Sequence, residues 1–160
     1  MKILAALALY LCITTAQADL FEDAQAACLR KDYATALRMY RSLAEQGSVY
    51  AQSNLGYMYD TGRGTPQDYA EALKWYRLAA EQGDASALNN LGTMYDNGHG
   101  VLQDYVESHK WFNLAASRET EEESQNGAIE NRDTIAKLMT TGQIAEAQKL
   151  AKQWDKAHPR

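Results

Sequence analysis

The chain has 160 residues, with 16 Lys and Arg residues against 21 Asp and Glu residues and a formal net charge of −5. This length suffices for one domain with a modest core. The acidic balance, without a basic cluster, argues against a general nucleic-acid or anionic-membrane binder, because both need concentrated Lys and Arg.

The first 18 residues have the features of a secretory signal peptide. Lys2 supplies a positive start, an apolar run covers Ile3 to Ile13, and Ala16-Gln17-Ala18 fits a cleavage site. The apolar run is about half of the roughly 20 residues that a spanning helix needs, which favours cleavage over a membrane anchor. We therefore expect residues 1–18 to be removed and the protein to be exported, to the periplasm or beyond. No later stretch predicts a membrane span.

Cys28 is the one cysteine that remains after such a cleavage. One cysteine cannot form an internal disulfide. It either packs as a small apolar residue on a helix face or links two chains through an intermolecular disulfide. In both cases the single chain depends on packing for its stability.

The sequence repeats itself at a shift of 36 residues. Between Asn54 and Ala80, 17 of 27 positions carry the same residue 36 positions later, and Asp32 to Gly47 matches more loosely. Such a period indicates a solenoid, whose units bury their apolar faces only by stacking. The two tryptophans that recur are expected in the core. Positions interpreted as structural are Leu55, Gly56, Tyr59, Gly62, Gly64 and Trp75, with counterparts Leu91, Gly92, Tyr95, Gly98, Gly100 and Trp111.

Each unit marks the ends of its helices. Asp68 and Glu71 have the spacing of a capping box, in which the two side chains bind backbone donors of the first turn. Asp104 and Glu107 repeat this spacing. Gly83 is expected to end the helix that Asp68 begins, because glycine adopts the left-handed conformation without a steric penalty.

Two pairs of glycines predict different features. Gly62 and Gly98 are expected to supply the positive φ of the loops between helices. Gly56 and Gly92 fall inside helices, where glycine costs about 1 kcal/mol relative to alanine. That cost is understandable if another helix crosses closely at these points.

The motifs resemble a known family. The pattern A-x-x-N-L-G-x-M-Y-x-x-G-x-G, then D-Y-x-E-A-x-K-W-Y-x-x-A-A-x-x-G, resembles the Sel-one-like repeat, a helical relative of the tetratricopeptide repeat. The resemblance implies an all-α fold, a right-handed α-solenoid of antiparallel helix pairs. It divides the mature chain into a tetratricopeptide-like first hairpin over 19–47, repeats over 48–83 and 84–119, and a closing hairpin over 120–160.

The closing hairpin departs from the repeat. The stretch SRETEEESQNG, residues 117–127, is either an acidic mobile linker or a helix start. Thr140 is expected to cap the last helix with Gln143 as its partner. Thr141-Gly142 follows directly and should loosen the start of that helix.

No group of residues in the sequence points to catalysis. The paired glycines follow helices, whereas a dinucleotide loop follows a strand. Asp96-Asn97-Gly98 lacks further ligands of a calcium loop, and His99, His109 and His158 have no metal-ligand spacing. We therefore predict that the protein is not an enzyme and has no cofactor or metal.

A binding surface is the remaining candidate. In tetratricopeptide-like stacks the first helix of each unit lines a concave groove. Tyr57 stands out there, because its counterpart is Thr93 and aromatic residues often anchor interfaces; alternatively, Tyr57 only packs against a neighbouring helix. By this resemblance the partner-facing positions are Tyr50, Ser53, Tyr57 and Thr61 in one unit and Ser86, Asn89, Thr93 and Asn97 in the next.

The resemblance implies an interaction module without catalysis, an adaptor or regulator of the bacterial cell envelope. We expect a monomer that binds a protein or peptide segment and no nucleic acid. One alternative is an inhibitor, such as an immunity protein that neutralises a toxin or envelope enzyme. Another is a weak hydrolase, as proposed for cysteine-rich relatives, but this chain lacks their paired cysteines.

Overall fold

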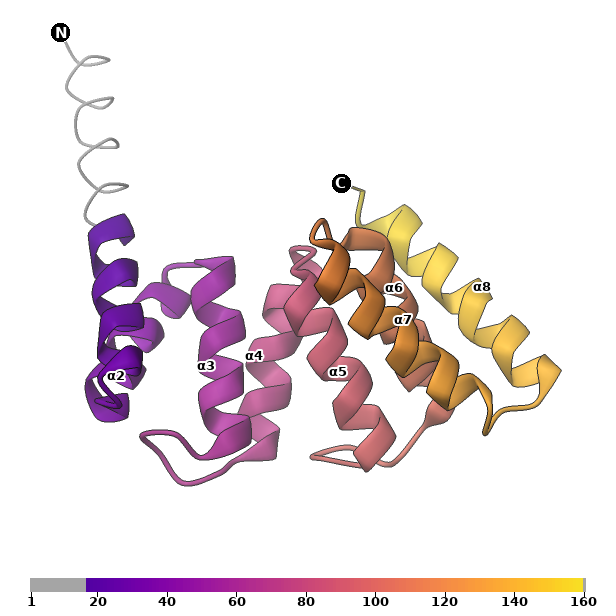
Figure 1. The fold of residues 1–160 in the computed structure, drawn as a ribbon, viewed down its shortest axis with the longest axis horizontal. Helices are drawn as coiled ribbons and strands as arrows, with labels where there is room; N and C mark the ends of the chain where they lie inside the picture. Colours follow the sequence, from indigo (N-terminus) through magenta and orange to yellow (C-terminus); the bar gives the residue numbers. More distant parts are fainter. Residues whose placement is uncertain (1–16, 160) are drawn as a thin grey trace, which may run out of the picture.

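The computed structural model describes residues 17–159, and the helices within this range form an elongated row (Figure 1). Residues 1–16, which hold most of the expected signal peptide, lie outside the described residues. A first helix covers 17–29. The helices that follow are α2 (Tyr33–Glu45), α3 (Val49–Thr61), α4 (Tyr69–Glu81), α5 (Ala85–Asn97), α6 (Tyr105–Arg118), α7 (Glu122–Ala136) and α8 (Thr141–Ala157).

Consecutive helices pack as antiparallel pairs from α2 through α7, and α8 returns to pack against α6. Figure 1 shows α2 at one end of the row and α8 at the other. Helices and turns account for the secondary structure of residues 17–159, without a strand. The all-helical repeat solenoid predicted from the sequence is confirmed.

The helix caps at Asp68 and Asp104 differ from the predicted capping boxes. The Asp68 carboxylate accepts hydrogen bonds from backbone N–H groups of the first turn at 3.0 and 3.1 Å, as expected. The Glu71 carboxylate does not reach back to the cap; it accepts from Lys74 and from Trp75 Nε1. The reason is that the backbone N–H of Asp68 already donates to the Tyr59 carbonyl at 2.9 Å.

The next unit repeats this arrangement. The backbone N–H of Asp104 donates to the Tyr95 carbonyl at 2.9 Å, and Glu107 pairs with Lys110 at 2.6 Å. A complete capping box forms at α8, between Thr140 and Gln143, as predicted. The helix begins directly after Thr140.

The glycines inside helices are sites of close helix crossing. A Cβ atom at Gly56 would lie 2.7 Å from the Tyr76 ring, and one at Gly92 would lie 2.6 Å from the Phe112 ring. The rings of α4 and α6 therefore occupy the space that a side chain would need. Gly62 caps α3 with a φ of 68° in the left-handed region, which confirms the predicted loop conformation.

A recurring hydrogen bond joins the paired helices. Arg41 of α2 donates to the Tyr59 hydroxyl of α3 at 2.7 Å. Arg77 of α4 donates to the Tyr95 hydroxyl of α5 at 3.0 Å. The residues of the second bond lie 36 positions after those of the first, so the two tyrosines have the same role in the stacking of the units.

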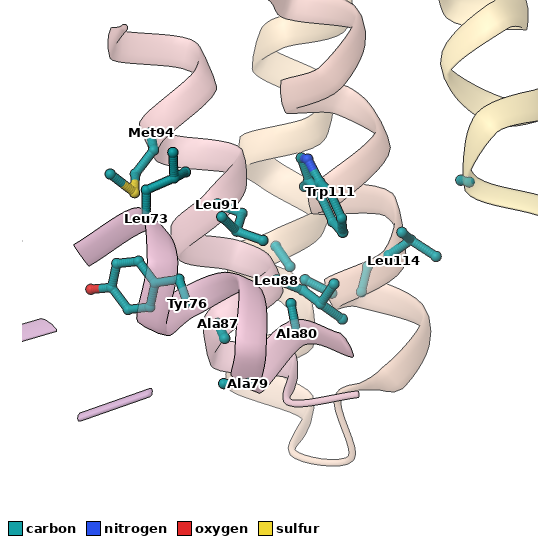
Figure 2. Close-up of a cluster of buried hydrophobic side chains, with 14 of the residues drawn as sticks. Leu73, Tyr76, Ala79, Ala80, Ala87, Leu88, Leu91, Met94, Trp111 and Leu114 are labelled. Carbon is teal, nitrogen blue, oxygen red and sulfur yellow. The ribbon is translucent and has the colours of Figure 1, made fainter. Parts of the chain in front are cut away.

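Two clusters of buried side chains form the core. The first helix, α2, α3 and Trp75 make one cluster, and α4 to α8 make the other. Trp75 and Trp111 are 8% and 9% exposed, so their predicted burial is confirmed. Figure 2 shows Trp111 of α6 in the second cluster, with Leu88 and Leu91 of α5. Tyr59 packs against both clusters and links them.

The stretch over 117–127 consists of the end of α6, a short turn and the start of α7. Of the two alternatives for this stretch, the helix start is right. Cys28 is half-buried on the first helix and packs against the first cluster. Its free thiol is therefore used at least in part for packing.

Arg118 secures α8 to the stack. Its side chain is 7% exposed and donates to the Asp155 carboxylate at 2.7 Å. The guanidinium lies over the Trp154 ring, 4.8 Å from its centroid, and also donates to the His158 carbonyl. Trp154 meets Trp111 edge to face at 5.8 Å, so α8 covers the second cluster.

Candidate binding groove

Three neighbouring hollows follow one another in chain order along the first helix, α3, α5 and α7, and together they are called the groove. The first and second share Asn54 and Tyr57, and the second and third share Ser86 and Asn90. These are the first helices of successive units, which the resemblance assigned to the concave face.

The first hollow is aromatic and apolar. It has a volume of about 510 Å³, within the range of about 300–1,000 Å³ typical of ligand pockets. Leu29 is 86% exposed and Tyr57 is 39% exposed, although both are large apolar side chains. The residues that line it are Gln25, Cys28, Leu29, Tyr33, Tyr40, Asn54, Tyr57, Met58 and Arg63.

The third hollow is polar. Asn131 of α7 donates from its amide to the Asn89 side chain of α5 at 3.2 Å. Ser86, Asn90 and Glu119 line the same hollow. The groove therefore changes along its length from aromatic and apolar to amide-rich.

The middle hollow contains a buried cap. The Asp84 carboxylate accepts from the backbone N–H of Ala87 at 2.7 Å and begins α5. Burial raises the pKa of Asp84 above its usual range, while the Ala87 amide and the Ser53 hydroxyl oppose this shift by hydrogen bonding. The carboxylate therefore serves the helix cap, and Tyr50 and Tyr57 are the aromatic residues that line the second hollow.

Five of the predicted partner-facing residues line the groove, and three do not. Tyr50, Ser53, Tyr57, Ser86 and Asn89 lie in it. Ser53 is only 8% exposed, so the expectation that it projects outward is wrong: α3 lies against the Asp84 cap there. Thr61, Thr93 and Asn97 lie outside the three hollows and hydrogen-bond to carbonyls one turn earlier in their own helices. Partner binding by the groove residues stays a prediction.

Sequence reasoning did not find Arg63, Leu29, Asn54 and Asn90. Asn54 and Asn90 recur at 36 residues and were not among the predicted partner-facing positions, yet both line the groove. Arg63 was considered only as part of a glycine loop. A signal was available, because both loops have the same paired glycines and Arg63 differs from its counterpart between them, His99.

The three histidines lie apart from one another. His99 stacks on Tyr69 with centroids 4.2 Å apart, and His158 stacks on Trp154 at 4.1 Å. His109 is 3% exposed inside α6. Burial lowers the pKa of His109 below its usual value, and the nearby Arg132 contributes to the shift. In the part of the chain that the structure describes, no cluster of His, Cys, Asp and Glu could hold a metal ion.

The chain contains three segments that match the Sel1 repeat, at residues 16–48, 49–84 and 85–119. These segments cover well over half of its length, so the protein belongs to the Sel1 repeat family. Sel1 repeat proteins are generally protein-interaction modules, and their fold is typically a non-catalytic scaffold. The first segment, expected to be tetratricopeptide-like, thus matches the Sel1 repeat itself.

Two solved structures resemble this chain in sequence and fold. One is a protective antigen present in uropathogenic Escherichia coli strains that displays an SLR fold. It is 32% identical with a TM-score of 0.79, over 90% of this chain and 30% of the antigen. The other, a Sel1 repeat protein from Oxalobacter formigenes, is 36% identical with a TM-score of 0.56, over 62% of this chain and 38% of that protein. The chain thus spans well under half of either relative. Among curated proteins, none matches.

Between residues 17 and 159, no helix is both long enough and apolar enough to cross a bilayer.

Proposed function

We propose that the protein is an exported, monomeric interaction module that binds an extended segment of a partner protein in the groove. The observation that carries this proposal is the gathering of exposed apolar side chains at one end of the groove. Leu29, Tyr50 and Tyr57 are 86%, 68% and 39% exposed, and all three line its first two hollows. A partner that covers them removes apolar surface from water, which drives association.

Tyr57 is the strongest single anchor in the groove. It belongs to both the first and the second hollow, and Arg63 lies against its ring at 5.0 Å from the centroid. A tyrosine held in this way loses little conformational freedom on binding. Interface hot spots favour such residues near the centre of the contact.

Capture from envelope extract tests the proposal. The protein, expressed from its full reading frame, is used as bait beside Tyr57→Ala and a control, Arg77→Ala. Arg77 is exposed on α4 and bonds to Tyr95 away from the hollows. We expect Tyr57→Ala to weaken binding by about 2 kcal/mol, roughly thirtyfold, at unchanged helicity. If Arg77→Ala abolishes capture and Tyr57→Ala does not, the groove is not the binding surface.

Export is a separate part of the proposal and rests on the sequence of residues 1–18. N-terminal sequencing of the exported protein is expected to begin at Asp19. Intact Met1 on protein in the membrane fraction would contradict both the export and the cleavage site. A captured toxin or envelope enzyme that loses activity on binding would favour the inhibitor role over an adaptor role.

A further inference from the structure

Arg63 is placed at the edge of the first hollow between two aromatic rings. Its guanidinium carbon lies 5.4 Å from the Tyr33 ring centroid and 5.0 Å from that of Tyr57. Within residues 17–159, no carboxylate lies within ion-pair distance of it, whereas Arg118 and Arg132 each have an aspartate partner at 2.7 Å. The charge of Arg63 is thus held in place without being neutralised.

The backbone around Arg63 fixes this placement. Gly62 and Gly64 on either side both have positive φ, at 68° and 77°. The Arg63 backbone N–H donates to the Met58 carbonyl at 2.9 Å, which closes the end of α3. A guanidinium stacked between rings keeps the N–H donors of its planar fork, which match a carboxylate.

The rest of the hollow is lined mainly by apolar and aromatic side chains, together with the uncharged amides of Gln25 and Asn54. Cys28, Leu29 and Met58 line it together with the tyrosines, and no Asp or Glu is among the described residues that do so. The chain as a whole has a net charge of −5. A cationic edge beside an apolar floor is therefore a local feature of an otherwise acidic protein.

We infer that the first hollow recognises an Asp or Glu side chain next to an apolar side chain in the partner segment. The carboxylate binds Arg63, and the apolar side chain covers Leu29, which is 86% exposed. The carboxylate belongs to a side chain, because the second hollow adjoins the first at Asn54 and Tyr57 and an extended segment that fills both runs past Arg63. This inference rests on the proposed function and adds the chemistry of the ligand.

The second repeat lacks this arrangement. The counterparts of Arg63, Tyr33 and Tyr57 are His99, Tyr69 and Thr93. His99 stacks on Tyr69 at 4.2 Å, but Thr93 supplies no second ring and an imidazole lacks the planar fork of donors that a guanidinium has. The acidic side chain is therefore recognised at one end of the groove only.

Selection from a library of octapeptides tests the inference. The peptides are acetylated and amidated at their ends, so that every carboxylate is on a side chain. We expect selected peptides to carry Asp or Glu beside an apolar residue. Changing that acid to its amide, or Arg63→Gln in the protein, should weaken binding roughly tenfold to hundredfold. Against Arg63→Gln, the acid and amide peptides should bind equally.

Arg77→Gln is the matched control, because it removes an exposed arginine outside the hollows. This variant should bind the acidic peptides as tightly as the parent does. Unchanged binding by Arg63→Gln, or equal binding of acid and amide peptides by the parent, would overturn the inference. The proposed function would still stand if Tyr57→Ala weakened the same peptides. In a parallel selection from peptides that keep a free carboxyl terminus, binding of those peptides alone would also overturn the inference. If no blocked peptide binds and Tyr57→Ala leaves capture unchanged, both proposals fail.

Discussion

The repeats at 49–84 and 85–119 share their stacking residues and differ at the groove. Gly56 and Gly92 both admit an aromatic ring from the next helix, and Trp75 and Trp111 are both buried. At the groove, Tyr57 is replaced by Thr93 and Arg63 by His99. The first repeat therefore presents a tyrosine and an arginine where the second presents a threonine and a histidine.

The difference separates two kinds of constraint. A repeat unit cannot bury its apolar face alone, so the residues at the contact between units must recur. A groove residue that is not needed for the contact between units is free to differ between them. Asn54 and Asn90 show that the separation is incomplete, because they recur and yet line the groove.

The largest effect is expected from the tryptophans. Trp75→Ala and Trp111→Ala should each cost about 3–5 kcal/mol of unfolding free energy, because each leaves a large cavity in the core. Thermal unfolding monitored by circular dichroism measures this. If Trp111→Ala melts like the parent but no longer binds a partner, Trp111 is a surface anchor. Trp75 and Trp111 would then not have the same role in the cores of the two repeats.

A smaller loss is expected when a side chain is added at the helix crossings. Gly56→Ala and Gly92→Ala should each cost about 1–3 kcal/mol, because the new methyl group overlaps a buried ring. Gly127→Ala is the control: nothing lies within 4 Å of a Cβ there, so the helix should gain about 0.4–1 kcal/mol. Equal effects at all three glycines, measured by urea unfolding, would show that close crossing does not explain the recurring pair.

The smallest effect concerns position 109, where the second repeat has a buried histidine and the first has Leu73. His109 Nδ1 is buried without a hydrogen-bond partner in the described structure. His109→Leu should therefore stabilise the protein by about 1 kcal/mol at pH 7. Thermal midpoints of the two proteins at the same pH give the difference.

The pH dependence of this difference has a definite sign. Because the pKa of His109 is lowered in the folded protein, the unfolded chain takes up a proton first as the pH falls below about 6.5. The parent should lose stability relative to His109→Leu between pH 7.5 and 5.5. A difference in unfolding free energy between the two proteins that stays constant over this pH range would contradict the lowered pKa of His109.

The sequence predicted the fold well because its signals are local or periodic. Helix ends follow from Asp68, Asp104 and Thr140, and the period of 36 residues implies the stacking. Predictions were weaker wherever they depended on a neighbouring element. Glu71 does not bond to the backbone N–H of Asp68, because that group already donates to the Tyr59 carbonyl of the preceding helix; Glu71 accepts from Trp75 instead.

The groove was harder to predict for the same reason. Ser53 is on the expected helix, but the Asp84 cap lies against it. Arg63 becomes a candidate binding residue only because the fold places it over the ring of Tyr33, which is 30 residues earlier in the chain. The periodic pattern locates the helix that lines a groove, and it does not show which side chains from other segments complete the surface.

The direct test of the role of the groove is the affinity of a captured partner for Tyr57→Thr, measured by isothermal titration calorimetry. This substitution gives the first repeat the residue that the second has at Thr93, and Thr93→Ala serves as the control. We expect Tyr57→Thr to weaken binding roughly thirtyfold, with an unchanged melting temperature, and Thr93→Ala to change it little. Unchanged affinity of Tyr57→Thr for a partner that Arg77→Ala no longer binds would contradict binding in the groove.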